Sequence, residues 1–349
     1  MTRWAVVLAG GVGSRFWPLS TQKRPKQLLP LVAKEPLLVE QLRRLRPLVS
    51  PARTLILTNA SLLNPIARAA PKIPRKNIIA EPRHAGTAAA LAWAANVIQA
   101  RDGRDATMIS VHADWAIGDA KGFRDALSAA ADAAEQHDAL VTVGIVPTRP
   151  DPGFGYIEPG PEVSQGSQGV RRVKRFVEKP TREKATEMRD QGYLWNSGIF
   201  AWRVGTFLDE VSALSPEVGP ALAKHGKSLR GFFAAVKPIA VDHAVLERSE
   251  RVLVVPGDFG WDDVGTWGSL QRVRQRDAQN NAVSGSVHAI DAANNVVHAD
   301  GSEQQVVLYG VNDLVVVAKD GLTLVTTIDR SADLKKLVES LPKHLRDRT

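Results

Sequence analysis

The feature that most constrains this chain is the alternation of short apolar runs with helical segments between residues 6 and 146. The apolar runs occupy residues 6–9, 54–58, 107–111 and 140–146, and helical patterns occupy residues 37–45, 85–100 and 123–136. Strands that alternate with helices form a parallel sheet with right-handed crossovers. We therefore expect an α/β fold with a Rossmann-like, mixed but mostly parallel sheet flanked by helices. Ligands of such sheets bind beyond the carboxyl ends of the strands, so the loops after residues 9, 79 and 111 should face one cleft.

The first apolar run ends in a glycine-rich loop. Gly10, Gly11 and Gly13 leave the backbone free of side chains, so that main-chain N–H groups can approach an anion closely. Arg15 and Lys26 add positive charge on either side of a loop that contains two prolines. A bare backbone with two cations suits a polyphosphate.

Two better-known phosphate-binding motifs are absent from this loop. A Walker loop requires Gly-Lys-Ser or Gly-Lys-Thr, and no such triplet follows Gly11. A dinucleotide fingerprint requires a third glycine where this chain has Phe16. The glycines alone are equally compatible with an ordinary tight turn after a strand.

Composition excludes several classes of protein. The 349 residues, 44% of them hydrophobic, are enough for a large domain and a smaller one. The absence of cysteine excludes disulfides, thiolate metal sites and a cysteine nucleophile. The first apolar run is too short for a signal peptide, and no run approaches the roughly 20 residues of a membrane span. We expect a cytoplasmic protein with no membrane partner.

The net charge of +8 comes from basic residues that are scattered along the chain. A nucleic-acid-binding surface would gather them on one face or along one helix. We therefore expect no nucleic acid as a partner. Anionic small-molecule substrates, or a basic surface that is merely solvated, agree better with the scatter.

Three aspartates are candidates for binding a metal ion. Asp114 closely follows the third apolar run, and Asp262 and Asp263 are adjacent in a turn. A carboxylate binds Mg²⁺ well when phosphate oxygens fill the other ligand positions. Adjacent carboxylates are rare in a core, because unpaired buried charge is costly. The alternatives are that Asp114 caps the next element and that the adjacent pair is simply solvated.

The loop before the second helical segment combines charged residues with a glycine and a threonine. Gly86 and Thr87 at a helix start indicate a cap and an N-terminus that favours anions, with a plain cap as the alternative. Glu81 and Arg83 would face the same cleft if the predicted sheet is correct. The alternative for these two is a surface ion pair, which contributes little.

From residue 279 onward the chain contains short β-type runs separated by turn residues. The runs occupy residues 282–287, 296–299, 306–309, 314–318 and 322–328, and a helical segment follows at 332–340. This pattern predicts a small all-β, short β-helix-like domain with a closing helix. We place a catalytic domain at residues 1–278 and this domain at residues 279–349. Its lack of ionisable clusters favours a role in packing or in forming a homodimer.

Six separated motifs resemble those of the sugar-1-phosphate nucleotidyltransferase family, and of its mannose-1-phosphate guanylyltransferases in particular. They are the glycine loop at 10–26, the proline-rich segment 147–157, Phe-Val-Glu-Lys-Pro at 176–180, Tyr-Leu-Trp-Asn-Ser-Gly-Ile-Phe at 193–200, residues 239–247, and Gly-Trp-Asp-Asp-Val-Gly at 260–265. They follow one another in the family's order. The chain departs from the family pattern at Ala85, Gly86, Ala240 and His243.

The resemblance implies that GMP is transferred from GTP to α-D-mannose 1-phosphate, with GDP-mannose and pyrophosphate as products and Mg²⁺ as cofactor. A phosphate oxygen of the sugar phosphate would attack the α-phosphorus in line. Because that nucleophile is already an anion, catalysis reduces to positioning and charge neutralisation. Two alternatives stay open, namely another pair of NTP and hexose 1-phosphate, and a non-catalytic scaffold with the same fold.

The resemblance also assigns roles to individual residues. It implies catalytic roles for Arg15, Lys26, Lys179, Asp114 and Asp263, of which the two aspartates would bind Mg²⁺. It implies nucleotide binding by Leu8, Ala9, Gly10, Gly11, Gly13, Ser14, Arg15, Lys26, Glu81, Gly86 and Thr87. It implies sugar binding by Gly155, Glu178, Lys179 and Asn196. Guanine presents two adjacent donors, N1–H and its exocyclic amine, and one carboxylate accepts both, so we expect Glu81 to recognise the base.

Overall fold

The computed structural model describes residues 1–11, 13–21, 24–163, 169–301 and 303–346. The chain forms two compact units. Unit 1 consists of Met1–Gly10, Arg43–His112 and Asp119–Phe259, and unit 2 consists of Gly11–Leu42, Ala113–Gly118 and Gly260–Thr349. Helix α1 (Leu37–Leu45) contains residues of both units. None of the helices within the described residues combines the length and the apolar character needed to cross a membrane.

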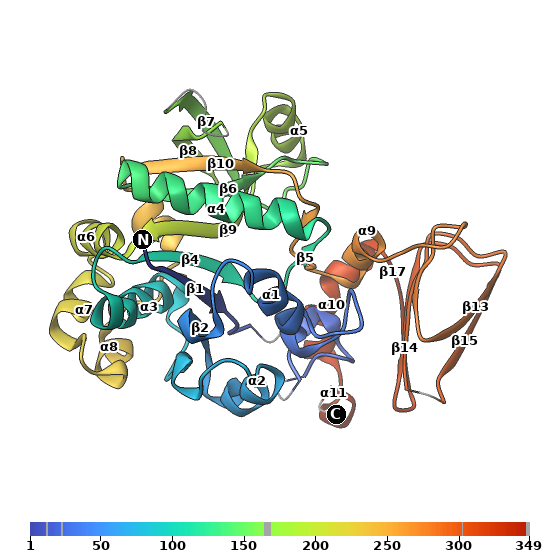
Figure 1. The fold of residues 1–349 in the computed structure, drawn as a ribbon. Coiled ribbons are helices and arrows are strands. Elements are labelled where there is room, and N and C mark those ends of the chain that lie inside the picture. Colours follow the sequence, from blue (N-terminus) through green and yellow to red (C-terminus); the bar gives the residue numbers. More distant parts are fainter. Residues whose placement is uncertain (12, 22–23, 164–168, 302, 347–349) are drawn as a thin grey trace. The chain divides into compact units, whose positions relative to one another are not determined.

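Unit 1 is built on a nine-stranded sheet (Figure 1). Its strands are, in spatial order, β3 (Ile78–Glu81), β2 (Thr54–Asn59), β1 (Arg3–Leu8), β4 (Thr107–His112), β9 (Leu194–Arg203), β6 (Leu140–Ile145), β10 (Val252–Gly257), β8 (Arg171–Val177) and β7 (Tyr156–Glu162). Strands β9 and β8 run antiparallel to their neighbours, and the other seven share one direction. The predicted mixed, mostly parallel sheet is confirmed.

The strands around β1 are buried on both faces, as continuous apolar runs predict for parallel strands. Their register aligns their carboxyl ends. Leu8 of β1 pairs with Leu57 of β2 and with His112 of β4, and Leu57 pairs in turn with Ile79 of β3. The residues that follow these strands therefore leave the sheet at one edge.

Two long helices cover this sheet. Helix α3 (Gly86–Asp102) contains a run of buried alanines, which are strong helix formers and small enough for close packing against β1 and β2. Helix α4 (Ala120–His137) packs on β4, β6, β9 and β10, and its N-cap Asp119 accepts a hydrogen bond from the Lys121 amide at 2.9 Å. The other helices of unit 1 are α2 (Leu63–Ala69), α5 (Arg182–Asp190), α6 (Val204–Leu214), α7 (Gly219–His225), α8 (Leu229–Ala235) and a π-helix at Asp242–Leu246.

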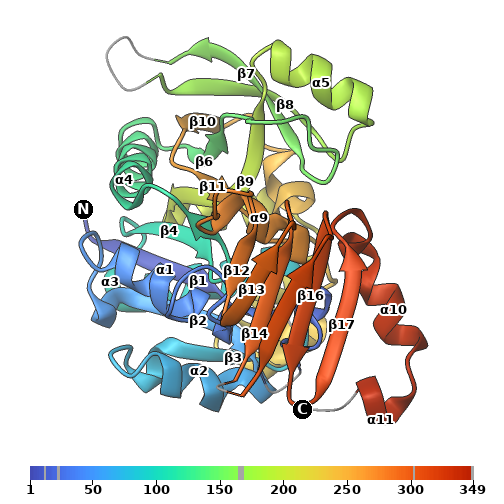
Figure 2. The ribbon, with the colours of Figure 1, turned by 90° about the vertical axis from the view of Figure 1, so that its right-hand side faces the viewer.

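Unit 2 contains the C-terminal strands, which form a short parallel coil (Figure 2). One sheet pairs β12 (Ala282–Ser284), β14 (Val296–Asp300), β16 (Leu314–Lys319) and β17 (Leu322–Thr327), and a second pairs β13 (Ser286–Ile290) with β15 (Gln305–Tyr309). Strands β12 to β16 alternate between the two sheets and pair in parallel, and β17 then pairs antiparallel with β16 in the first sheet. The predicted β-helix-like fold is confirmed. Unit 2 also contains β5 (Ala116–Ile117), β11 (Trp261–Asp262), α9 (Leu270–Val273), α10 (Leu334–Ser340), α11 (Lys343–Arg346) and several 3-10 helices.

The C-terminal strands share one hydrophobic core with the segment that follows the glycine loop. Val296 and Val315 are buried in one cluster with Phe16, Trp17 and Trp267. The Trp267 indole also donates a hydrogen bond to the Trp17 carbonyl at 3.1 Å. The strands therefore hold the glycine-loop segment in place within unit 2. The boundary between residues 278 and 279 stays a prediction.

Candidate functional site

The glycine loop presents an open backbone. A Cβ atom added to Gly10 or Gly11 would meet none of the described atoms within 4 Å, so neither glycine is required by internal packing. Gly13 differs, because its φ is +71° and a Cβ there would lie 2.3 Å from the Lys26 Cβ. The Ser20 hydroxyl donates to the Gly13 carbonyl at 2.7 Å and fixes the turn. Gly10 and Gly11 are thus left accessible to a ligand, while Gly13 allows Lys26 to pack closely.

Lys26 lies at the centre of the polar group in unit 2. It is 6% exposed, and its Nζ donates to Asp114 Oδ2 at 2.9 Å and to the Asp263 carbonyl at 2.6 Å. The ammonium also lies 5.8 Å from the centroid of the Phe16 ring. Three segments that are distant in sequence therefore meet at one lysine. Arg15 is exposed and has no ion pair with any residue that the structure describes.

The two adjacent aspartates have different environments. The Asp262 carboxylate is buried, accepts from the Val264 amide at 2.9 Å and binds the Arg272 guanidinium at 2.8 Å. Asp262 is thus part of the turn. Burial raises the pKa of Asp263 to about 6, and the nearby charges of Asp262 and Asp114 add to this increase. Asp263 is the carboxylate of the pair that would gain from a bound cation.

The donor set of this group suits Mg²⁺. Carboxylate oxygens are the ligands Mg²⁺ prefers, and a divalent cation beside Asp114 and Asp263 would relieve the mutual repulsion that raises the Asp263 pKa. Among the described residues, no group of three or more His, Cys, Asp or Glu side chains could enclose a metal ion. Further ligands would have to come from water or from phosphate oxygens, as is usual for Mg²⁺.

Glu81 is an unpaired carboxylate at the end of β3 in unit 1. Burial raises its pKa to about 7, and among the described residues it has no hydrogen-bond or ion-pair partner. Arg83 does not pair with it. The Arg83 guanidinium donates instead to the carbonyls of Phe233, at 2.6 Å, and of Val236. The alternative of a surface ion pair between Glu81 and Arg83 is therefore wrong.

Gly86 and Thr87 connect the start of α3 to the segment before the π-helix. Gly86 has a φ of +81°, and a Cβ there would lie 2.1 Å from the Ile239 carbonyl oxygen. The Thr87 hydroxyl accepts from the Val241 amide at 2.9 Å. The N-cap of α3 is Ala85, which has no side-chain cap, so the prediction that Thr87 caps the helix is wrong. Both residues have a structural task that the sequence did not reveal.

The predicted sugar-binding residues meet in unit 1. A Cβ on Gly155 would lie 2.8 Å from Glu178 Oε2 and 3.6 Å from the Asn196 Cβ. The backbone N–H of Asn196 donates to the Gly155 carbonyl at 2.8 Å. Lys179 pairs with Glu178 at 2.9 Å and is exposed. The group combines a carboxylate, an amide and a cation around a glycine, which matches the hydrogen-bonding groups of a sugar phosphate.

Comparison with known proteins places the chain in a family. A family profile described as "Nucleotidyl transferase" matches residues 4–311. The chain belongs to the nucleotidyl transferase family. It is 36% identical to the mannose-1-phosphate guanylyltransferase of Escherichia coli over 98% of this chain and 74% of that protein, and 35% identical to that of Klebsiella pneumoniae over the same shares. A crystal structure described as mannose-1-phosphate geranyltransferase from Thermus thermophilus superimposes with a TM-score of 0.88 at 35% identity, covering 97% of this chain and 99% of that one.

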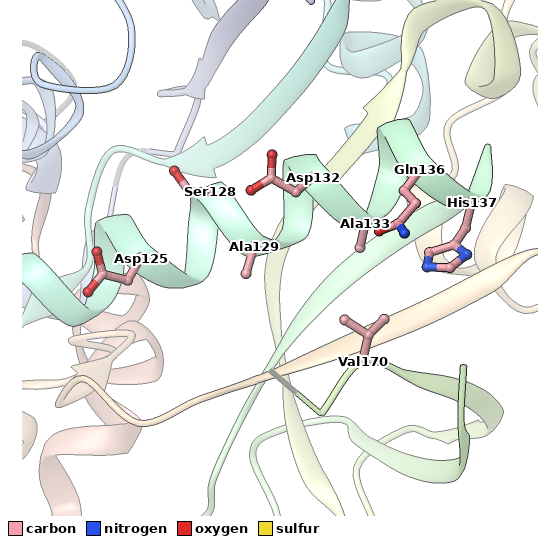
Figure 3. Close-up of a pocket in the computed structure, with 8 residues that line it drawn as sticks. All are labelled: Asp125, Ser128, Ala129, Asp132, Ala133, Gln136, His137 and Val170. Carbon is pink, nitrogen blue, oxygen red and sulfur yellow. The ribbon is translucent and has the colours of Figure 1, made fainter. Parts of the chain in front are cut away.

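One surface pocket of this nucleotidyl transferase contains none of the predicted site residues. It is lined by Asp125, Ser128, Ala129, Asp132, Ala133, Gln136, His137 and Val170. Figure 3 shows that these side chains lie along α4, apart from Val170. Asp125 is paired with Lys121 at 2.6 Å and Asp132 with Arg3 at 2.5 Å, so its acidic groups already have cationic partners. The pocket is therefore separate from the residues predicted for the site.

The structure adds residues to those predicted for the nucleotidyl transferase. Asn59 donates from Nδ2 to the Gly10 carbonyl at 3.3 Å, and Thr58 donates from its hydroxyl to the Ala9 carbonyl at 2.9 Å. These bonds hold the backbone after Leu8 at the sheet edge. Asp242 contacts Asn196 in the sugar group. Their sequence positions carry no sign of these contacts, apart from the motif at residues 239–247 that contains Asp242.

Proposed function

We propose that this nucleotidyl transferase transfers GMP from GTP to α-D-mannose 1-phosphate and releases GDP-mannose and pyrophosphate. The observation that carries the proposal is the group around Lys26 in unit 2. Its buried ammonium binds the Asp114 carboxylate and the Asp263 carbonyl, and Gly13 of the glycine loop packs against the lysine side chain. Such a group suits a triphosphate with a divalent cation. The choice of GTP and mannose is supported by the similarity to the two bacterial guanylyltransferases.

The reaction requires positioning and charge neutralisation. A nonbridging oxygen of the sugar phosphate forms a bond to the α-phosphorus of GTP, and the bond from that phosphorus to the α–β bridging oxygen breaks, so that pyrophosphate leaves with both electrons. We assign the triphosphate to the amides at Gly10 and Gly11 and to Arg15 and Lys26. Lys179, which is exposed, would offset the repulsion between the two phosphates.

We propose Mg²⁺ as the cofactor, held by Asp114 and Asp263. When bound, Mg²⁺ neutralises negative charge on the triphosphate and on the leaving pyrophosphate. The protein's own contribution is to hold the two carboxylates in place. The Lys26 ammonium fixes Asp114, and the Asp262–Arg272 pair fixes the turn from which Asp263 projects.

We assign recognition of the base to Glu81 and of the sugar to Gly155, Glu178 and Asn196. The Glu81 carboxylate, which lacks a partner among the described residues, would accept from N1–H and the exocyclic amine of guanine. Adenine would be rejected, because it has no N1–H and would turn a lone pair toward the carboxylate. The sugar hydroxyls would bind Glu178 and Asn196.

Pyrophosphate release with Mg²⁺ and a panel of NTPs and hexose 1-phosphates tests the proposal. We expect GTP with mannose 1-phosphate to give the highest kcat/KM. A faster reaction with another pair would replace the substrates and keep the reaction class. No release with any pair, from folded protein, would contradict catalysis and leave a scaffold of the same fold.

We further propose that the protein is a homodimer. Ile290, Val307 and Tyr309 on β13 and β15 are more than half exposed, which favours an interface on the C-terminal coil. Sedimentation equilibrium tests this, and a monomer at micromolar concentration would contradict it. The cytoplasmic location stays a prediction that cell fractionation would test.

A further inference from the structure

Asp242 occupies a rigid position beside the sugar group of unit 1. It begins the π-helix Asp242–Leu246, whose Ala244, Val245 and Leu246 are buried in the core. The Glu247 amide donates to the Asp242 carbonyl at 2.8 Å and closes the turn. The backbone at Asp242 is therefore held by its own helix and by the core beneath it.

A second anchor holds the residues before Asp242. The Val241 amide donates to the Thr87 hydroxyl at 2.9 Å, and the Ile239 amide donates to the Ala85 carbonyl at 3.3 Å. The backbones of Ile239 and Gly86 also pack closely, because a Cβ on Gly86 would lie 2.1 Å from the Ile239 carbonyl oxygen. The backbone from which the Asp242 carboxylate projects is consequently held in place relative to the strands of unit 1.

The carboxylate of Asp242 is in contact with Asn196. Asn196 Nδ2 donates to Asp242 Oδ1 at 2.7 Å, which is the length of a charge-assisted hydrogen bond. Burial raises the pKa of Asp242, the bond from Asn196 opposes that shift, and the nearby Glu178 charge adds to it. Asp242 thus lies close to both polar side chains that we assign to the sugar.

The contact determines how Asn196 presents its side-chain amide. A carboxylate accepts but does not donate, so the Asn196 amide must turn its nitrogen toward Asp242 and its oxygen away. The oxygen lies 3.4 Å from the Gly198 amide, in a bulge where the pairing of β9 with β6 shifts between Val143 and Gly144. Without Asp242 only the longer contact with the Gly198 amide would distinguish the two ends of the side-chain amide, and it would hold them less firmly. A sugar hydroxyl would then meet a donor in some molecules and an acceptor in others.

We propose that Asp242 is a positioning residue for the sugar, which fixes the orientation of the Asn196 amide and so contributes to selection among hexose 1-phosphates. This inference rests on the proposed function, because it takes Asn196 as a sugar ligand. The ligand class is a hexose 1-phosphate whose ring hydroxyl reaches the amide. Asp242 acts through Asn196 and has no role toward the nucleotide.

The test measures steady-state kinetics for Asp242→Ala, Asp242→Asn, Asn196→Ala and the double variant Asp242→Ala/Asn196→Ala. The substrates are the NTP and the hexose 1-phosphate that the wild type uses best, so a wrong assignment of GTP or mannose would appear in the wild type alone. We expect Asp242→Ala to raise KM for the sugar phosphate by about tenfold and leave KM for the NTP unchanged, as loss of a charge-assisted bond predicts. Asp242→Asn should recover most of the loss, because its amide oxygen can still accept from Asn196.

Two further results decide between positioning and general structure. The double variant should be no worse than Asn196→Ala, since Asp242 acts only through that residue. The wild type should be tested with a series of hexose 1-phosphates that each lack one hydroxyl, and its kcat/KM should fall strongly when one particular hydroxyl is missing. Asp242→Ala should no longer be sensitive to the loss of that hydroxyl, and its sensitivity to the others should be unchanged. Glu247→Gln, an exposed change at the end of the same helix, serves as the control and should match the wild type. Equal increases in both KM values, additive losses in the double variant, or unchanged discrimination among the deoxy sugars would overturn the proposal.

Discussion

Replacing Asp263 with Asn should stabilise the protein while removing most of its activity. In the folded chain the Asp263 pKa is about 6, against 3.8 for an ordinary aspartate, because the group is buried near two other carboxylates. The unfolded state therefore binds fewer protons between pH 4 and pH 6, and the free energy of unfolding falls as pH rises through that window. At pH 7.5 the full penalty of about two pKa units is present, which corresponds to at most about 3 kcal/mol. The neutral amide removes this penalty.

The assay compares thermal unfolding in EDTA and in Mg²⁺, together with kcat. In EDTA we expect Asp263→Asn to unfold at a higher temperature than the wild type. Mg²⁺ with GTP should stabilise the wild type more than the variant, and kcat should fall by at least about 10²-fold. Asp262→Asn is the matched control. It should destabilise the fold by about 1–3 kcal/mol, because Arg272 loses its charged partner, and it should keep its response to Mg²⁺. An active Asp263→Asn enzyme, or one destabilised like the control, would show that Asp263 is neither a metal ligand nor an uncompensated buried charge.

Substitutions in three other parts of the chain test the nucleotide loops and the pH dependence of stability. Glu81→Gln should cost about 1–3 kcal/mol in kcat/KM for GTP and less for ITP. In the wild type kcat/KM should rise with pH through about 7, as the Glu81 carboxyl ionises, and the substitution should remove this rise. Unchanged kinetics with GTP and ITP would exclude Glu81 as the residue that recognises the base. Gly86→Ala should lower the free energy of unfolding by more than about 1 kcal/mol, because Gly86 has a positive φ and the added Cβ would lie 2.1 Å from a carbonyl oxygen. Gly10→Ala should weaken GTP binding and leave the stability unchanged. Equal unfolding temperatures for the two variants would contradict this difference. Burial lowers the pKa of His298 to about 4, so the folded chain does not take up the proton that the unfolded chain binds below about pH 6.5. The free energy of unfolding should therefore fall by about 3 kcal/mol from pH 7 to pH 4. Chemical denaturation at several pH values should show a weaker dependence of stability on pH for His298→Asn, but not for the exposed control His288→Gln.

The sequence predicted the elements that depend on local pattern. The apolar runs became β1, β2, β4 and β6, and α1, Leu37–Leu45, has the predicted bounds. The placement of β9 between β4 and β6 was not predictable, because pairing between strands distant in sequence leaves no periodic signal. Helix α3 begins one residue after the predicted start and ends two residues after the predicted end, and α4 begins three residues earlier and ends one residue later than predicted, since propensity does not mark exact ends.

The sequence predicted which residues contribute to the candidate site, but not the contacts that those residues make in the folded chain. The sequence contains two adjacent aspartates, and only the folded chain shows that Arg272 forms an ion pair with Asp262 and not with Asp263. Gly86 was predicted as part of a nucleotide-binding loop. In the structure a glycine is required there because the Ile239 backbone, distant in sequence, leaves no space for a Cβ. The sequence left open an ion pair between Arg83 and Glu81, whereas the acceptors of Arg83 are carbonyls near the end of α8. Contacts of this kind depend on tertiary packing and have no local signature.

In the proposed reaction a sugar phosphate oxygen attacks the α-phosphorus of GTP, and isotope labelling follows that oxygen into the product. Mannose 1-phosphate labelled with ¹⁸O in its nonbridging oxygens would be incubated with unlabelled GTP, Mg²⁺ and the protein, and the products examined by ³¹P NMR and mass spectrometry. We expect GDP-mannose that carries ¹⁸O in the bridge between its two phosphorus atoms, with all of the label retained and none in pyrophosphate. A bridge containing ¹⁶O, or label in the pyrophosphate, would contradict it.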